Sequence, residues 1–168
     1  QGGVFEGLTE AGIECDWAAG ISIGAINAAL IAGNAPAQRV ERLREFWNTV
    51  TVPPLLPPTA AWWADALESG GAVSRTALGW FEASRALLEG QRGFFVPRMP
   101  SPAFSTLSAP SELSHYDTAP LRATLERLVD FDRINHEKGL RLTVSAVNIE
   151  SGNFELFDSR RGRWAHRI

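Results

Sequence analysis

One five-residue segment, residues 20–24, constrains the fold of this chain more than any other. It follows a short run with small residues at its end, residues 13–19, which is typical of a strand buried on both faces of a parallel sheet. It precedes an Ala-rich run, residues 25–32, which ends at Gly33-Asn34. A helix that is apolar nearly all round lies at the centre of a fold. The chain is therefore expected to place a tight strand-to-helix turn in its core.

This turn reads Gly20-Ile21-Ser22-Ile23-Gly24, the G-x-S-x-G pattern of a nucleophile elbow. A strained backbone in such a turn projects the serine hydroxyl outward, so Ser22 is the expected nucleophile. Side chains at Gly20 and Gly24 are expected to collide with the neighbouring strand and helix. The following helix directs its free N–H groups at Ser22, which favours a developing oxyanion. The alternative is a packing turn whose serine only caps the helix.

Length and composition describe a globular protein of about one domain. The chain has 168 residues, of which 45% are hydrophobic and 21% charged. Its longest apolar run, around residues 23–31, is too short to span a bilayer. The net charge of −3 argues against a nucleic-acid partner. A single cysteine, Cys15, excludes an internal disulfide or a Cys-based zinc site, so a cytoplasmic setting is expected, with Cys15 as a small buried hydrophobe.

Residues 1–50 are expected to form one nucleophile-elbow unit. Val4, Phe5 and Leu8 recur at helical spacing, and that helix stops at residues 11–12, Ala-Gly. A further helix is predicted over residues 38–48. Its core-facing side is predicted to carry Val40, Leu43 and Trp47.

Residues 51–114 are rich in proline and aromatic residues and are expected to form a helical insertion or cap. Helices are predicted over residues 59–68 and 74–89, the second with an apolar stripe of Leu78, Phe81 and Leu88. A Pro-rich loop with Phe94 and Phe95 follows. Two interpretations stay open: a cap over an apolar site or a lipid-contacting face, and an insertion that packs its aromatic residues inward.

Residues 115–168 are expected to form a helix and a β-hairpin. Asp117 caps the helix, Pro120 lies in its first turn, and Leu121, Leu125 and Leu128 form its buried stripe. Strands are predicted over residues 140–147 and 154–157, joined by a turn at residues 150–153. Helices that alternate with buried strands make the fold class α/β.

A nucleophilic serine needs a base. A Ser–His–Asp triad would draw on the three histidines, with Asp158 preceding the last of them in the required order. These histidines are His115, His136 and His166. Their local sequence does not support the triad, and surface histidines explain all three.

Several segments resemble the patatin-like phospholipase family: residues 7–13 running into 19–29, then residues 116–121 and the strand at 143–148. The resemblance spans nearly the whole chain. It implies a three-layer α/β/α sandwich with a central, mostly parallel sheet. It also implies a lipid acyl hydrolase of the esterase or phospholipase A type, with a Ser–Asp dyad, Ser22 as nucleophile, and neither cofactor nor metal. The implied partners are a lipid or acyl-ester substrate and, peripherally, a membrane surface.

Two family elements are not found. The glycine-rich loop that supplies oxyanion N–H groups normally lies just before the first helix, and Gly2-Gly3 does not replace it. The dyad aspartate belongs to a D-G-[AG] motif, and no aspartate here precedes a glycine. None of them is assigned the role: Asp16, Asp65, Asp117, Asp130, Asp132, Asp158. A partial domain, truncated at both ends and inactive as a fragment, is expected.

Two other functions remain as alternatives. A serine acyltransferase of the malonyl-transferase type would place histidine and glutamate where this chain has Ile21 and Ala25. A non-catalytic lipid- or protein-binding fragment would rely on aromatic residues rather than on Ser22. Those aromatic residues are Trp62, Trp63, Phe94 and Phe95.

Overall fold

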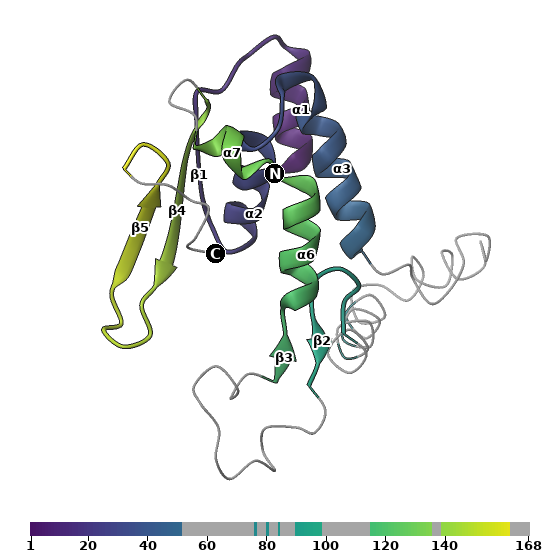
Figure 1. Cartoon of the computed structure of the whole chain (residues 1–168). Helices are drawn as coiled ribbons and strands as arrows, with labels where there is room; N and C mark the ends of the chain where they lie inside the picture. The colour runs from purple at the N-terminus through teal and green to yellow at the C-terminus, as the bar shows by residue number, and fades with distance from the viewer. Residues whose placement is uncertain are drawn as a thin grey trace, which may run out of the picture. The chain divides into compact units, whose positions relative to one another are not determined.

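The computed structural model describes residues 1–51, 76, 80, 84, 90–98, 115–135 and 139–161 (Figure 1). The chain forms two compact units. Residues Gln1–Asn48 and Ala123–Ile168 make the first, and residues Thr49–Arg122 make the second. The expected functional division at residues 50 and 114 stays a prediction.

The described helices and strands alternate along the chain, which makes the fold α/β. The bounds are as follows: α1 Gly2–Glu10, β1 Trp17–Ile21, α2 Ile23–Ala32, the 3₁₀ helix η1 Pro36–Gln38, α3 Arg39–Val50, β2 Val96–Pro97, β3 Tyr116–Asp117, α6 Ala119–Leu128, α7 Phe131–Ile134, β4 Arg141–Val147 and β5 Phe154–Asp158. β2 and β3 pair antiparallel within the second unit. No helix among the described residues is long and apolar enough to cross a membrane.

The main sheet has the strand order β1-β4-β5 (Figure 1). β1 and β4 run parallel, with Trp17 opposite Arg141 and Ile21 opposite Ser145. β4 and β5 run antiparallel and form the predicted hairpin, which is confirmed to within one residue at each strand. The described sheet is therefore mixed, with one parallel and one antiparallel pairing.

The prediction of a strand at residues 13–19, buried on both faces, is wrong. β1 starts at Trp17 and continues through Gly20 to Ile21. Its residues alternate between exposed and half-buried, because α2 packs on one face of the sheet and leaves Trp17 and Ile21 on the other. Cys15, expected to be buried, is half-buried just before the strand.

α2 is the central helix, as predicted from its composition. Each of its ten residues is at least half-buried, and Leu30 is fully so. Gly33 ends the helix where a Cβ would lie only 2.5 Å from Cγ1 of Val129. The close approach of α2 to the turn after α6 therefore requires glycine at this position.

The core-facing stripe of α3 differs from the prediction. Leu43 is buried as expected, but Phe46 and Val50 complete the stripe in place of Val40 and Trp47. Trp47 stays 38% exposed. An indole needs a partner for its N–H, and Trp47 finds one at the edge of the core.

The predicted helices that correspond to α1 and α6 are both present. α1 ends at Glu10 as expected, with Gly12 in a left-handed conformation, φ 72°. In α6, Leu128 is buried, whereas Leu121 and Leu125 are only half-buried, so the predicted stripe is confirmed in part. Asp117 Oδ1 accepts a hydrogen bond from the Ala119 N–H at 2.9 Å, so this carboxylate does cap the start of the helix.

Much of the aromatic-rich middle lies outside the described residues: the predicted helix at residues 59–68, Trp62, Trp63 and the stripe of Leu78, Phe81 and Leu88. Thr76, Trp80 and Ser84 are helical, in agreement with the second predicted helix. Phe95 makes edge-to-face contacts with Phe94 and Tyr116, at centroid distances of 6.0 and 4.7 Å. Both phenylalanines are half-buried, so these two side chains pack inward.

Candidate active site

Ser22 joins the end of β1 to the start of α2 and has a strained backbone. Its φ is 53° and its ψ −126°. It is the only non-glycine residue with positive φ in the described part of the chain. A side chain in this conformation costs on the order of 1–3 kcal/mol, and such strain persists where the surroundings impose it.

The close contact between Gly20 and α2 helps to impose this strained conformation on Ser22. A Cβ at this position would lie 2.2 Å from both the C and O atoms of Gly24. The first turn of α2 therefore rests directly on β1, and this contact forces the sharp turn at Ser22. Gly24 differs from the expectation, because a Cβ there would meet only the Gln1 side chain, at 3.8 and 4.0 Å, an ordinary contact.

The Ser22 side chain does not cap α2. The Ser22 carbonyl accepts hydrogen bonds from the N–H groups of Ala25 and Ile26, at 2.9 and 3.3 Å. The hydroxyl makes no capping hydrogen bond, and Ser22 is exposed. The capping alternative for this serine is therefore wrong, and the hydroxyl has no hydrogen-bond partner among the described residues.

The carboxyl end of β1 places Ser22 beside the first turn of α2. The N–H groups of Ile23 and Gly24 have no carbonyl one turn before them within this helix. Their partial positive charge lies close to the Ser22 hydroxyl, where it favours a negatively charged oxygen. Two apolar side chains flank Ser22 in the turn. Ile21 is exposed and Ile23 is half-buried.

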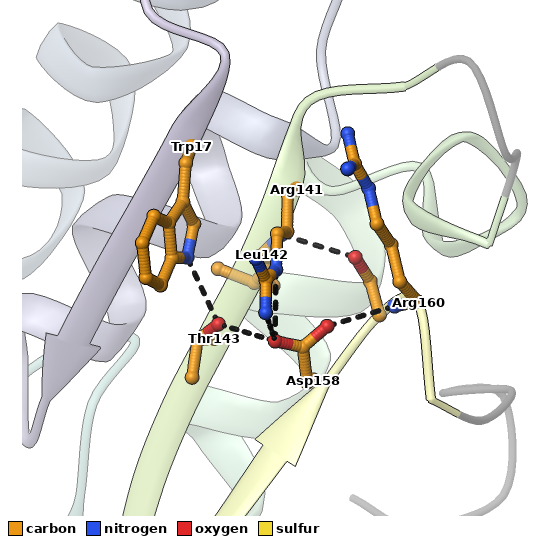
Figure 2. Close-up of polar contacts among 7 residues, drawn as sticks. Trp17, Arg141, Leu142, Thr143, Asp158 and Arg160 are labelled. Carbon is orange, nitrogen blue, oxygen red and sulfur yellow. Dashed lines mark hydrogen bonds and ion pairs between the residues drawn. The ribbon is translucent and has the colours of Figure 1, made fainter.

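Asp158, the candidate triad carboxylate, is committed to another interaction (Figure 2). Its Oδ2 accepts hydrogen bonds from Nε and a terminal nitrogen of Arg141, at 2.9 and 2.7 Å, and from the Thr143 hydroxyl at 2.9 Å. Thr143 in turn accepts one from the Trp17 indole at 3.0 Å. The cluster joins β1, β4 and β5 and locks their register.

This cluster keeps Asp158 ionised and away from Ser22. The hydrogen bonds from Arg141 lower the pKa of Asp158 to about 2, which makes it a weak base. The register also places Asp158 level with Ala19, three residues before Ser22 and roughly 10 Å back along the strand direction. Asp158 therefore serves the sheet rather than the serine.

The Asp158 pair gives the stability a defined pH dependence. Because its folded pKa is lowered, the pair stabilises the fold fully above about pH 4, and this contribution is lost as the pH falls through about 2. The contribution lies below about 2.5 kcal/mol, because solvent partly screens the pair. Asp158→Asn should lower the urea midpoint at pH 7 and flatten its pH dependence between pH 4 and 2.

Asp16→Asn is the control, since the Asp16 carboxylate has no hydrogen bond to any described residue. An unchanged pH profile in Asp158→Asn would contradict this account.

The other described aspartates also lie away from the serine or have local roles. Asp130 Oδ1 accepts a hydrogen bond from the Arg133 N–H at 3.0 Å and caps α7. Asp16 precedes β1 at the strand end opposite to Ser22. Asp132 is exposed in the first turn of α7. Asp65 lies outside the described residues.

His115 is the one histidine in the described part of the chain, and it belongs to the second unit. His115 is exposed in a bend before β3, and His136 and His166 lie outside the described part of the chain. Within that part, no group of His, Cys, Asp and Glu side chains is arranged to hold a metal ion. The triad alternative thus has no geometric support from Asp158.

Comparison with known proteins identifies the family. A family model described as patatin-like phospholipase matches residues 1–165. Neither a curated protein nor a solved structure gives a match. The match covers almost the whole chain, as the motifs around Ser22 predict. The chain therefore belongs to the patatin-like phospholipase family, whose members are lipid acyl hydrolases.

Proposed function

We propose that this chain is part of a carboxylic-ester hydrolase of the phospholipase A or esterase type, with Ser22 as its nucleophile. One observation carries the proposal: Ser22 alone among the described non-glycine residues has positive φ, and its hydroxyl is exposed and uncommitted. Strain of this kind concentrates at functional sites. A serine used only for packing would instead relax into a capping conformation.

The reaction proceeds through an acyl-enzyme. The Ser22 Oγ attacks the ester carbonyl carbon while its proton passes to a carboxylate base. The tetrahedral intermediate expels the alcohol, which takes that proton. Water then attacks the acyl-enzyme, gives a proton to the base and releases the fatty acid, and Ser22 regains its proton. Water, not a second alcohol, is the proposed acceptor.

The base is proposed to be an aspartate outside these 168 residues, as in the Ser–Asp dyad that the family resemblance implies. The local roles of Asp158 and Asp130 support this, because each carboxylate accepts hydrogen bonds from other residues than Ser22. Backbone donors outside these residues are proposed to hold the oxyanion, together with the amino end of α2. The isolated 168-residue piece should therefore turn over substrate at least about 10²–10³-fold more slowly than the complete enzyme.

The proposed architecture is a three-layer α/β/α sandwich with a mostly parallel sheet. α2 covers one face of the sheet. On the other face, Ile21, Phe154 and Leu156 are 61–72% exposed. A second layer of helices would bury these side chains. Peripheral contact with a membrane surface stays a prediction.

A fluorophosphonate probe tests the nucleophile in the full-length protein. Wild type should be labelled, and Ser22→Ala should not be. Ser145→Ala is the matched control, since Ser145 is half-buried opposite Ile21, the residue next to Ser22. It should keep wild-type labelling. Labelling that survives in Ser22→Ala would overturn the proposal.

Product analysis separates hydrolysis from the other functions. Incubation with a phospholipid should release free fatty acid in proportion to labelled enzyme. Transfer of the acyl chain to an added alcohol in preference to water would favour an acyltransferase. Binding to lipid vesicles without any labelling would favour a non-catalytic module.

A further inference from the structure

Asn27 is the only polar residue in α2, and it is 6% exposed. A buried amide in an otherwise apolar helix is expensive unless its hydrogen bonds are made. Asn27 makes one on each side. Its Nδ2 donates to Gln1 Oε1 at 2.7 Å, and its Oδ1 accepts from the Trp47 indole N–H at 3.1 Å.

These two hydrogen bonds connect three helices at one point. Gln1 stands directly before α1, and its carbonyl accepts the Phe5 N–H of the first turn. Trp47 belongs to α3 and contacts Phe46 edge to face at 5.6 Å. Asn27 therefore fixes where α1 begins relative to the central helix.

Among the described residues, α1 makes few polar contacts with the other helices. None of its residues is buried, and Val4 is 70% exposed. Besides the Gln1–Asn27 hydrogen bond, the Glu6 carboxylate forms an ion pair with Arg44 of α3. Solvent and salt weaken an exposed ion pair. The Gln1–Asn27 hydrogen bond is partly buried and therefore less open to competition from water.

The start of α1 lies against the nucleophile turn. The Gln1 side-chain amide is the nearest group to a Cβ built at Gly24, at 3.8 and 4.0 Å. Gly24 is two residues after Ser22, in the first turn of α2. The Gln1 side chain therefore lies beside the turn that begins at Ser22.

We propose that Asn27 is a positioning residue for the reaction at Ser22: it holds the Gln1 end of α1 against the first turn of α2. This inference rests on the proposed function of Ser22. A displacement of about 1 Å near a reacting group can lower a rate about 10²-fold. Loss of the Asn27 side chain should therefore slow Ser22 chemistry while Ser22 itself is unchanged.

The first arm of the test measures structure. Hydrogen exchange of residues 1–10 is followed in full-length wild type, Asn27→Ala and Asn34→Ala. Asn34 is the matched control, since its amide is 8% exposed and donates to the Leu30 and Leu128 carbonyls, at the other end of α2. Asn27→Ala should speed exchange in α1, and Asn34→Ala should not. Unchanged exchange in Asn27→Ala overturns the inference whatever the activity.

The second arm measures the rate constant for fluorophosphonate labelling, per mole of folded protein. Asn27→Ala should lower it about 10–100-fold, Asn34→Ala less than about 2-fold. Gln1→Leu should change the rate in the same direction as Asn27→Ala. The double variant should be no slower than Asn27→Ala alone, because the Gln1–Asn27 hydrogen bond is already lost there. Faster exchange in α1 with an unchanged labelling rate overturns the inference, as do additive effects. Labelling that persists in Ser22→Ala identifies the proposed function itself as the failure.

Discussion

Gly20→Ala is expected to destabilise the first unit by about 3 kcal/mol or more. The new Cβ would lie 2.2 Å from the C and O atoms of Gly24 and 2.5 Å from the Ala25 nitrogen. All three are backbone atoms, so no side-chain rotation relieves the overlap, and α2 must move off β1. Overpacking that side chains can absorb costs only about 1–3 kcal/mol. Urea denaturation of the full-length protein measures the change.

Gly24→Ala provides the matched control, since the same methyl group is added four residues later. It would meet only the end of the Gln1 side chain, at 3.8 Å or more. Replacing glycine by alanine within a helix without a clash stabilises by roughly 0.5–1 kcal/mol. The two variants should therefore shift the urea midpoint in opposite directions. Equal shifts would show that the close contact between β1 and α2 does not exist.

Ser22→Gly is expected to stabilise the protein and to abolish its activity. Glycine adopts φ 53° and ψ −126° without the penalty of a side chain. The relief of about 1–3 kcal/mol exceeds the loss of roughly 0.4–1 kcal/mol from the greater freedom of the unfolded chain. The net gain should be about 1 kcal/mol. Turnover of a lipid ester should fall at least about 10³-fold, because the nucleophile is lost.

Ser22→Ala distinguishes these two effects. It removes the same hydroxyl but keeps the Cβ in the strained conformation, so its activity should fall equally while its stability changes by less than about 0.5 kcal/mol. Thermal denaturation and fatty-acid release, measured on both full-length variants, check the pair. A Ser22→Gly variant no more stable than Ser22→Ala would show that the turn is not strained.

Helices and strands could be predicted where the local pattern of residue types determines them. The Ala-rich composition of α2, the glycines that end α1 and α2, and the alternation in β4 appear in the structure within one or two residues. The errors concern packing partners. The pattern at residues 13–19 predicts that Trp17 lies in a strand covered on both sides, but whether a strand is covered depends on which helices reach it. Likewise, Phe46 rather than Trp47 is the α3 residue that packs into the protein core.

The candidate active site shows the same difference between what local sequence predicts and what only the tertiary structure reveals. The spacing of Gly20, Ser22 and Gly24 was enough to mark the turn, but only the structure distinguishes the two glycines by what surrounds them. Asn27 could have been noticed as the single polar residue in an apolar helix. Its partners Gln1 and Trp47 are 26 and 20 residues away, and no local pattern indicates them. Asp158 stands in the chain order that a triad requires, but its carboxylate accepts hydrogen bonds from Arg141.

By itself, the sequence determined the family, the α/β class and the position of the strand-to-helix turn at Ser22, because these depend on residue type and on the order and spacing of motifs along the chain. The tertiary structure alone decided that Gly20 but not Gly24 is closely packed, that the Ser22 side chain does not cap α2, and that Asn27 bonds to the residue before α1. These depend on distances between segments far apart in the chain. Such distances are set only when the apolar faces of the helices and strands pack together.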